Sequence, residues 1–236
     1  MSSHESGRQA PTALIVGASR GLGHALAAEL LGRGWDVVGT VRDTAGRTLL
    51  HDLADRFPGR VTVEHLDINE PAGLPPLHER LAARTLDILF VNAGTAKAVD
   101  TPIGAVTTEE FVEVMVTNAL SPMRVIEGLE DLVPASGLIG VMSSGQGSLT
   151  NNVRGLRELY RGSKAAVNMF MRSYAARRPD RALVLIAPGW VRTALGGDQA
   201  PLTIEDSIPG VADVLLSKLG KPGLEYRNHK GETVPW

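Results

Sequence analysis

The sequence predicts an α/β domain in which a doubly wound parallel sheet carries helices on both faces. Short apolar runs rich in β-branched residues alternate with longer stretches of helical periodicity, and this order is typical of parallel strands joined by right-handed crossovers. The strand runs are almost entirely apolar, as expected when helices cover both faces of a sheet. A glycine-rich turn follows the first run. Because doubly wound sheets bind ligands beyond the carboxyl ends of their strands, this turn marks the edge where we expect the functional site.

The expected elements alternate along the chain, and several end at residues that break them. Strands are expected at the apolar runs 12–16, 36–41, 61–66, 86–91, 138–142, 182–186 and 224–227. Helices are expected between them at 22–33, 44–57, 77–84, 108–133, 159–177 and 208–218. Gly17 ends the first strand and Gly34 closes the first helix. Pro58 stops the second helix, and Pro122 predicts a kink inside the longest one.

Composition excludes several classes of function. The formal net charge of −2 gives no electrostatic basis for binding nucleic acid or an anionic membrane surface, and no apolar run approaches the length of a membrane span. The chain has no cysteine, which excludes disulfides, thiolate catalysis and cysteine-based metal sites. Its six histidines are scattered, so no metal site is expected. The beginning of the chain lacks the apolar core of a signal peptide, and we expect a soluble cytoplasmic protein.

Tyr160 and Lys164 lie four residues apart within a predicted helix and therefore project from the same face. An ammonium beside a phenol favours the phenolate, so this pair predicts a tyrosine with a lowered pKa. Such a tyrosine exchanges a proton with a substrate oxygen near neutral pH. The alternative is a solvated helix face with the tyrosine packed beneath it. The spacing alone does not decide between them.

The glycine-rich turn predicts a dinucleotide site. It reads Gly17-Ala18-Ser19-Arg20-Gly21-Leu22-Gly23. Glycines at a strand-to-helix turn let the backbone approach a pyrophosphate closely, and the helix N-terminus adds unpaired N–H groups. A turn without a ligand is the alternative. A position after the first strand of an alternating pattern favours the cofactor, so we expect residues 12–236 to form one Rossmann-type dinucleotide-binding and catalytic domain. The polar residues 1–11 are expected to be a disordered tail.

The end of the second strand predicts NADP(H) in preference to NAD(H). This position meets the adenosine ribose, where an acidic residue accepts from a free 2′-hydroxyl and a basic residue holds a 2′-phosphate. Arg42 follows the second strand, and Arg20 lies in the glycine turn. Two guanidiniums suit a phosphate dianion. Asp43 directly after Arg42 weakens the signal, and a surface Arg–Asp pair is the alternative.

With these motifs, the chain resembles the short-chain dehydrogenase/reductase family from about residue 12 to residue 236. Five further motifs of the family occur in the family's order: Asp67-Ile68, Val91-Asn92-Ala93-Gly94, Asn118, Val141-Met142-Ser143-Ser144 and Pro188-Gly189-Trp190-Val191-Arg192-Thr193. The resemblance implies that the cofactor meets Asp67 and Ile68 at its adenine, the turn Asn92, Ala93 and Gly94, the pair Tyr160 and Lys164, and Pro188, Gly189, Val191 and Thr193 at its nicotinamide. Val16 and Val91 depart from the family's usual Thr and Asn.

A narrower resemblance is to the C-factor (C-signal) branch of this family. Tyr160 lies sixteen positions after Ser144, three more than is usual in the family. The insert, Gly196-Gly197 and the ending Gly-x-x-x-Pro-Trp at residues 231–236 carry this likeness. Members of the branch are often described only as oxidoreductases, so the substrate stays open.

The resemblance also implies a role for each residue of the catalytic site. Ser144 would donate a hydrogen bond to the substrate carbonyl, and Tyr160 would give its proton to the developing alkoxide. Lys164 would lower the pKa of the tyrosine and bind the nicotinamide ribose. Asn118 would hold a water that links Lys164 to solvent. As alternatives, Ser144 is a strand-end turn serine and Asn118 a buried asparagine that satisfies a backbone carbonyl at a helix bend.

Three functions are compatible with these residues, and we expect the first. The first is an NADP(H)-dependent oxidoreductase that reduces a ketone or aldehyde, or oxidises the alcohol, by hydride transfer. The second uses the Tyr/Ser pair for non-redox acid–base chemistry, as a cyclase, dehydratase or epimerase. The third is a dinucleotide-binding signalling protein. The partners implied are a small carbonyl or alcohol substrate and a second copy of the chain, since family members commonly form homodimers or homotetramers.

Overall fold

A computed structural model describes residues 10–42 and 46–236 of the chain. Its sheet has seven parallel strands in the order β3-β2-β1-β4-β5-β6-β7. The strands are β1 (Thr12–Val16), β2 (Asp36–Val41), β3 (Val61–His65), β4 (Ile88–Val91), β5 (Leu138–Met142), β6 (Ala182–Ala187) and β7 (Gly223–Asn228). The strand order reverses between β1 and β4, and this switch point is where such sheets bind ligands. The predicted fold class is confirmed, while the expected tail falls almost wholly on residues 1–9, outside the described residues.

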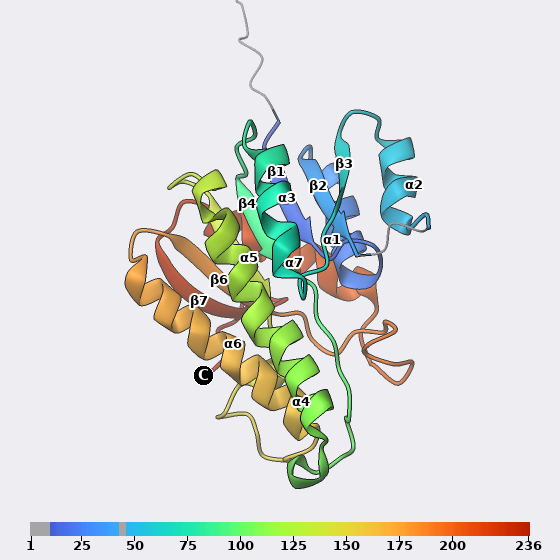
Figure 1. Cartoon of the computed structure of the whole chain (residues 1–236), viewed down its shortest axis with the longest axis vertical. Coiled ribbons are helices and arrows are strands. Elements are labelled where there is room, and N and C mark those ends of the chain that lie inside the picture. Colours follow the sequence, from blue (N-terminus) through green and yellow to red (C-terminus); the bar gives the residue numbers. More distant parts are fainter. Residues whose placement is uncertain (1–9, 43–45) are drawn as a thin grey trace, which may run out of the picture.

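Helices cover both faces of the sheet (Figure 1). One face carries α3 (Leu74–Leu81), α5 (Ser121–Leu129) and α6 (Glu158–Arg177), and the other carries α1 (Gly21–Gly32), α2 (Leu49–Arg56) and α7 (Ile204–Lys218). α4 (Thr108–Met115) precedes α5 on the same helical axis and lies beside α6.

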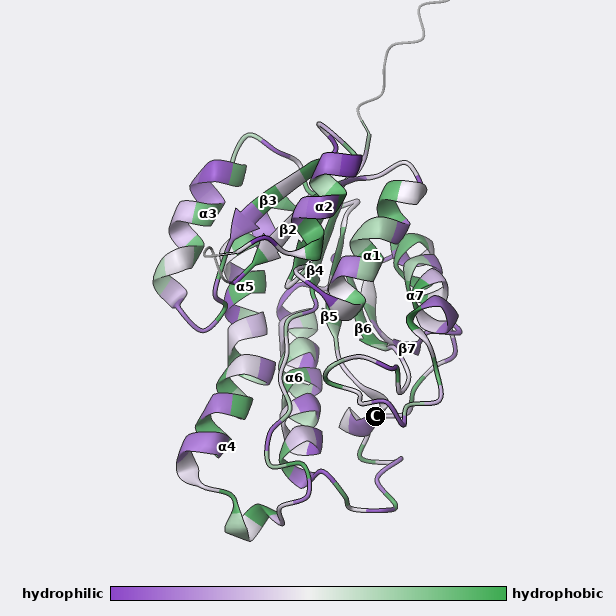
Figure 2. Ribbon diagram, turned by 90° about the vertical axis from the view of Figure 1, so that its right-hand side faces the viewer, coloured by the Kyte–Doolittle hydropathy of each residue, from purple (hydrophilic) through white to green (hydrophobic). Residues whose placement is uncertain are grey.

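The strands contribute side chains to two separate hydrophobic cores, because successive side chains of a strand point to opposite faces of the sheet. In β1, Leu14 and Val16 pack into the core under α3, α5 and α6, whereas Ala13 and Ile15 pack under α1 and α7. Figure 2 shows the result, with apolar strands inside and hydrophilic helix faces outside.

The helix predicted over 108–133, with a kink at Pro122, differs in two respects: it is interrupted before Pro122, and α5 ends at Leu129, where a 3₁₀ turn follows. A π-helical segment, Val116–Leu120, separates α4 from α5. Such a segment widens the helix by one residue and is frequent at functional sites. Pro122 lies in the first turn of α5, a position at which helices tolerate proline.

Three other helix boundaries differ from the prediction for identifiable reasons. α3 begins before its prolines, since Pro75 and Pro76 stand in the first turn, where no N–H is needed. α7 begins four residues early because Thr203 and Asp206 form a capping box. The predicted start of α2 at residue 44 is wrong for the described residues 46–48, because Thr48 caps the helix and α2 begins at Leu49; residues 44 and 45 lie outside the described residues.

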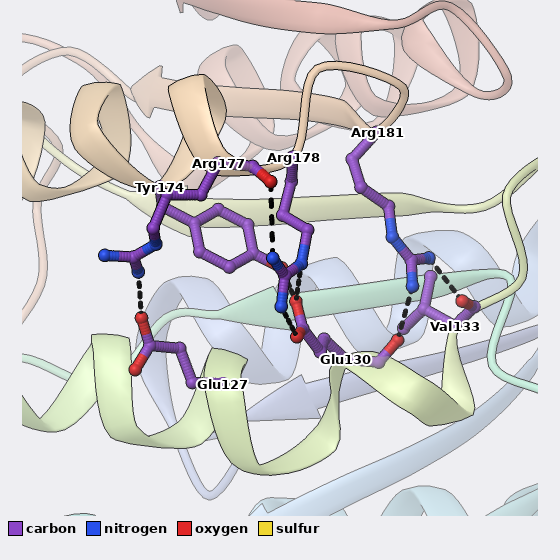
Figure 3. A network of polar contacts seen from close by, with 7 residues as sticks. All are labelled: Glu127, Glu130, Val133, Tyr174, Arg177, Arg178 and Arg181. Atoms are coloured by element: carbon purple, nitrogen blue, oxygen red, sulfur yellow. Dashed lines mark hydrogen bonds and ion pairs between the residues drawn. The ribbon is translucent and has the colours of Figure 1, made fainter.

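A polar network fastens the far end of α6 to the end of α5 (Figure 3). Arg178 pairs with Glu130 at 2.7 Å, and the Tyr174 hydroxyl donates to the same carboxylate. Arg181 donates to main-chain carbonyls, including that of Glu130 at 3.0 Å. Every charged group in this network has a protein partner, so we assign it a structural role. It fixes the helix that carries Tyr160.

Candidate active site

The segments predicted to meet a dinucleotide gather at one edge of the sheet. Each directly follows a strand, and because all the strands are parallel their carboxyl ends meet at the same edge. Along the sheet from β3 to β6, these segments are Asp67-Ile68, Arg42, residues 17–23, Asn92–Gly94, Ser144 and residues 188–193. Three further predicted residues lie beside the middle of this edge, on the helices that cover one face of the sheet: Asn118, Tyr160 and Lys164.

The glycine turn is folded so tightly that it leaves no room for a side chain at Gly17 or Gly23. Gly17 has φ +88°, and a Cβ there would lie 2.9 Å from Ala93. A Cβ on Gly23 would lie 2.1 Å from the Gly17 carbonyl oxygen. Asn92 donates to that same oxygen at 2.8 Å. The turns after β1 and β4 therefore lock together at the switch point, and the predicted cofactor residues Gly17, Gly23, Asn92 and Ala93 are brought into contact.

The first turn of α1 is open to an anion. Arg20 is its N-cap residue, but no side chain caps the helix and its first turn has no acidic residue. The N–H groups at such a terminus point outward and carry partial positive charge. A Cβ on Gly21 would meet nothing within 4 Å, so the space beside it is clear. These features fit a pyrophosphate bound at the helix N-terminus.

Tyr160 and Lys164 lie on the buried side of α6 and face the end of β5. Only 8% of Tyr160 and 4% of Lys164 is exposed. The Lys164 ammonium donates to the Met142 carbonyl oxygen at 2.9 Å and lies 5.9 Å from the centre of the Tyr160 ring. Ser144 follows β5, and its hydroxyl accepts from the Gln146 N–H at 3.2 Å. The Ser144 side chain lies near enough to Tyr160 to lower the pKa of its phenol, against the effect of burial. The structure thus brings the three predicted residues together.

The pKa of Tyr160 differs from the prediction. Burial raises the pKa of this phenol, while the hydrogen bond with Ser144 and the charge of Arg157 act in the opposite direction. Burial also lowers the pKa of Lys164 to about 8. The predicted lowering of the tyrosine pKa is therefore wrong for the protein without a bound cofactor. Burial of the phenol raises the pKa more than the nearby charge and hydrogen bond lower it.

Asn118 lies in the π-helical segment and is fully buried. Its Oδ1 accepts from the Thr95 N–H at 2.8 Å, and its Nδ2 donates to the Thr95 carbonyl at 2.8 Å and to Ser163 Oγ at 2.9 Å. The side chain therefore ties the turn after β4 to α6. A Cβ on Gly94 would lie 3.3 Å from Asn118 Oδ1 and 3.5 Å from Lys164 Nζ, so these three residues lie close together.

The two predicted adenosine contacts lie at strand ends farther along the row. Arg42 is exposed directly after β2, and its carbonyl oxygen lies 2.7 Å from His65 Nε2, within hydrogen-bond distance. Asp67 accepts from the Asn69 N–H at 2.9 Å, and Ile68 is buried. Asp43, which weakened the cofactor prediction, lies outside the described residues.

The segment after β6 is held by its own contacts. Gly189 has φ +90°, a conformation that favours glycine. The Pro188 carbonyl accepts from the Ser207 hydroxyl at 2.7 Å, and Thr193 Oγ1 accepts from the Gly196 N–H at 3.0 Å. Val191 forms a bridge with Leu202. This turn is therefore prearranged beside β5 and the Ser144 turn.

Sequence reasoning missed residues that surround the Ser144 turn. The Arg157 guanidinium stacks 5.2 Å from the centre of the Tyr160 ring. Asn168 accepts from the Ser143 hydroxyl at 2.6 Å, and Tyr226 donates to the Ser144 carbonyl. For Asn168 a signal was available, since it stands one helical turn after Lys164. For Tyr226 no local signal exists.

Within the described ranges, no group of three or more His, Asp or Glu residues could hold a metal ion. The helices of these ranges are also too short or too polar to cross a membrane.

The model of the short chain dehydrogenase family matches residues 11–201. The chain belongs to the short-chain dehydrogenase family. This short-chain dehydrogenase is 33% identical to C-signal from Myxococcus xanthus over 155 residues, which are 64% of this chain and 93% of that protein. Among solved structures, it is 61% identical to a protein from Burkholderia multivorans assigned to the short-chain dehydrogenase/reductases and solved with bound NADP. That match covers 97% of this chain and 100% of the other, with a TM-score of 0.95. A carbonyl reductase from Pseudomonas aeruginosa PAO1 in complex with NADP is 33% identical, with the same coverage and a TM-score of 0.90.

Proposed function

We propose that this short-chain dehydrogenase is an NADP(H)-dependent oxidoreductase that reduces a ketone or aldehyde, or oxidises the corresponding alcohol. One observation carries the proposal. Tyr160 and Lys164 from α6 and Ser144 from the turn after β5 lie together at the sheet edge that carries the glycine turn.

The residues at this edge fit a dinucleotide. The clear space beside Gly21, the uncapped start of α1 and the glycine positions that exclude side chains together suit the pyrophosphate. Arg20 and Arg42 would hold the 2′-phosphate, and residues 188–193 would meet the nicotinamide. NADP in the relatives from Burkholderia multivorans and Pseudomonas aeruginosa supports the choice of cofactor. Bound NADPH supplies the hydride for reduction.

The protein's own residues handle the substrate oxygen. Ser144 would donate a hydrogen bond to the substrate carbonyl and hold it beside Tyr160. The raised pKa of Tyr160 keeps the phenol protonated at neutral pH, so it can donate its proton as negative charge develops on that oxygen. The Lys164 ammonium would then stabilise the phenolate. A water near Gly94, Asn118 and Lys164 would return a proton from solvent.

The decisive experiment compares wild type with Tyr160→Phe in NADPH consumption on a panel of ketones and aldehydes. We expect kcat/KM to fall by about 10²–10⁴-fold, the usual contribution of general acid catalysis, while NADPH binding is retained. Tyr174→Phe is the control, because Tyr174 is a buried tyrosine of the same helix that bonds to Glu130 instead. A wild-type protein that binds NADPH and reduces no carbonyl compound would exclude the proposed function.

The similarity to C-signal supports one alternative, a signalling role that uses the dinucleotide without turnover. Full biological activity of the Tyr160→Phe variant would favour it. Non-redox acid–base chemistry by the Tyr/Ser pair is distinguished by product formation that does not depend on the oxidation state of the nicotinamide.

We also propose that the protein is a homodimer or homotetramer in the cytoplasm, where reduced nicotinamide is supplied. α4 and α6 lie side by side (Figure 1) and expose four large apolar side chains, Phe111, Val112, Met169 and Phe170. A paired copy of the chain would cover them. A purely monomeric mass in light scattering would exclude this assembly.

A further inference from the structure

The turn that carries Ser144 is fastened from behind by β7 and the residues that follow it. The Tyr226 hydroxyl, on β7, donates to the main-chain carbonyl of Ser144. Farther along the turn, the Trp236 carbonyl oxygen accepts from the Thr150 N–H at 3.0 Å and from Thr150 Oγ1 at 2.7 Å. Ser148 Oγ donates to the same oxygen at 3.4 Å. Both halves of the segment 144–150 are thus held by residues 226–236.

Tyr226 is itself held rigidly. Only 2% of it is exposed, and its main-chain carbonyl accepts from the Val234 N–H at 2.9 Å. Its ring packs against Trp236, with the ring centres 5.4 Å apart. The Arg172 guanidinium covers the Trp236 ring at 4.7 Å, which ties residues 231–236 to α6. A buried aromatic ring fixed on two sides gives its hydroxyl a defined position.

The carbonyl that Tyr226 holds belongs to the residue whose hydroxyl faces Tyr160. Ser144 has extended backbone dihedrals (φ −162°, ψ 145°) and begins the short turn Gly145–Gly147. The neighbouring carbonyls are also held, Met142 by Lys164 and Gly147 by Asn168 at 3.3 Å. Rotation of the Ser144 peptide would move its hydroxyl relative to Tyr160, and a small displacement of a substrate-orienting group has large effects on rate.

We propose that Tyr226 is a positioning residue for Ser144, and that residues 231–236 act with it as a strap that holds the substrate-orienting turn in place. The inference rests on the proposed function, in which Ser144 orients the substrate carbonyl. It assigns a role to the ending Gly-x-x-x-Pro-Trp, which the proposed chemistry does not use.

The test compares Tyr226→Phe with Tyr174→Phe. Both variants remove one buried tyrosine hydroxyl that donates a hydrogen bond, to the Ser144 carbonyl in one case and to Glu130 in the other. We expect both to lower Tm by a similar amount. Only Tyr226→Phe should lower kcat, by about 10-fold, with KM for NADPH unchanged, and only this variant should speed amide hydrogen exchange in residues 144–150.

A second pair of variants probes the strap without touching Tyr226. Trp236→Ala removes the ring that packs on Tyr226 and should lower kcat by several fold with faster exchange in 144–150, whereas Trp236→Phe should restore both. Wild-type kcat and unchanged exchange in Tyr226→Phe would overturn the inference while leaving the proposed function intact. If wild type reduces no carbonyl compound, the proposed function fails, and the exchange measurement still decides whether Tyr226 orders the turn.

Discussion

Lys164 donates a hydrogen bond of 2.9 Å from its ammonium to the main-chain carbonyl of Met142, the last residue of β5. This bond joins α6 to the strand that leads into Ser144. Only 4% of Lys164 is exposed, and burial lowers the pKa of its ammonium from 10.5 to about 8. The same lysine therefore positions the site and carries a cost in stability while it is charged.

That cost predicts a pH dependence of folding. Between pH 8 and 10.5 the unfolded chain retains the Lys164 proton and the folded protein has largely lost it, so the free energy of unfolding rises with pH. Below pH 8 the lysine is charged in both states and this gain is absent. From pH 8 to about pH 9.5 we expect wild type to gain about 1–2 kcal/mol from this group, at about 1.4 kcal/mol per pH unit.

Urea unfolding across this range checks the prediction, with Lys164→Met as the matched variant. The series stops at about pH 9.5 because burial raises the pKa values of Tyr160 and Tyr226 above the ordinary value of 10.0. At higher pH the unfolded chain loses these protons before the folded protein does, and this lowers the free energy of unfolding. The wild-type minus Lys164→Met difference isolates the lysine. A difference that stays flat with pH would contradict the lowered pKa.

A second prediction concerns the turn at the switch point. Gly17→Ala would place a methyl group 2.9 Å from Ala93 at a residue with φ +88°. Because both backbone strain and overpacking oppose this change, we expect a loss of about 2–5 kcal/mol in the free energy of unfolding and loss of NADPH binding.

The matched control is Gly32→Ala at the end of α1, where a Cβ meets nothing within 4 Å. This change should be neutral or stabilise the protein by up to about 1 kcal/mol. Urea unfolding measures both variants. Equal stability of Gly17→Ala and wild type would show that the two turns can separate without cost.

The fold could be predicted from sequence because strand and helix patterns are local. That Ser144 and Tyr160 lie at the same edge of the sheet was also predictable. Ser144 follows a predicted strand, Tyr160 begins the helix after it, and the carboxyl ends of parallel strands share one edge. What escaped prediction depends on contacts between distant segments. The direction of the Tyr160 pKa follows from burial, which no spacing reveals, and Asn118 finds its partners at Thr95 and Ser163, 23 and 45 residues away. The π-helical segment has the apolar periodicity of an ordinary helix, so its widened turn was invisible.

The third prediction addresses the choice between NADPH and NADH. Arg42 is exposed directly after β2, beside the end of β1 where the glycine turn begins. Its carbonyl oxygen lies 2.7 Å from His65 Nε2, and this contact holds the backbone at the end of the strand. Hydrogen bonds to charged groups contribute about 1.5–3 kcal/mol. Arg42→Ala should therefore lower the preference for NADPH over NADH by about 10–100-fold.

The ratio of kcat/KM for the two cofactors measures this preference, and Arg47→Ala is the control. Arg47 is an exposed arginine close by in the chain whose guanidinium pairs with Asp52 and Asp55, so its removal changes the local charge equally without removing a candidate phosphate ligand. If long-range charge alone set the preference, both variants would lower it to the same extent. An unchanged ratio in Arg42→Ala would instead move the 2′-phosphate toward Arg20, where Arg20→Ala should then produce the loss.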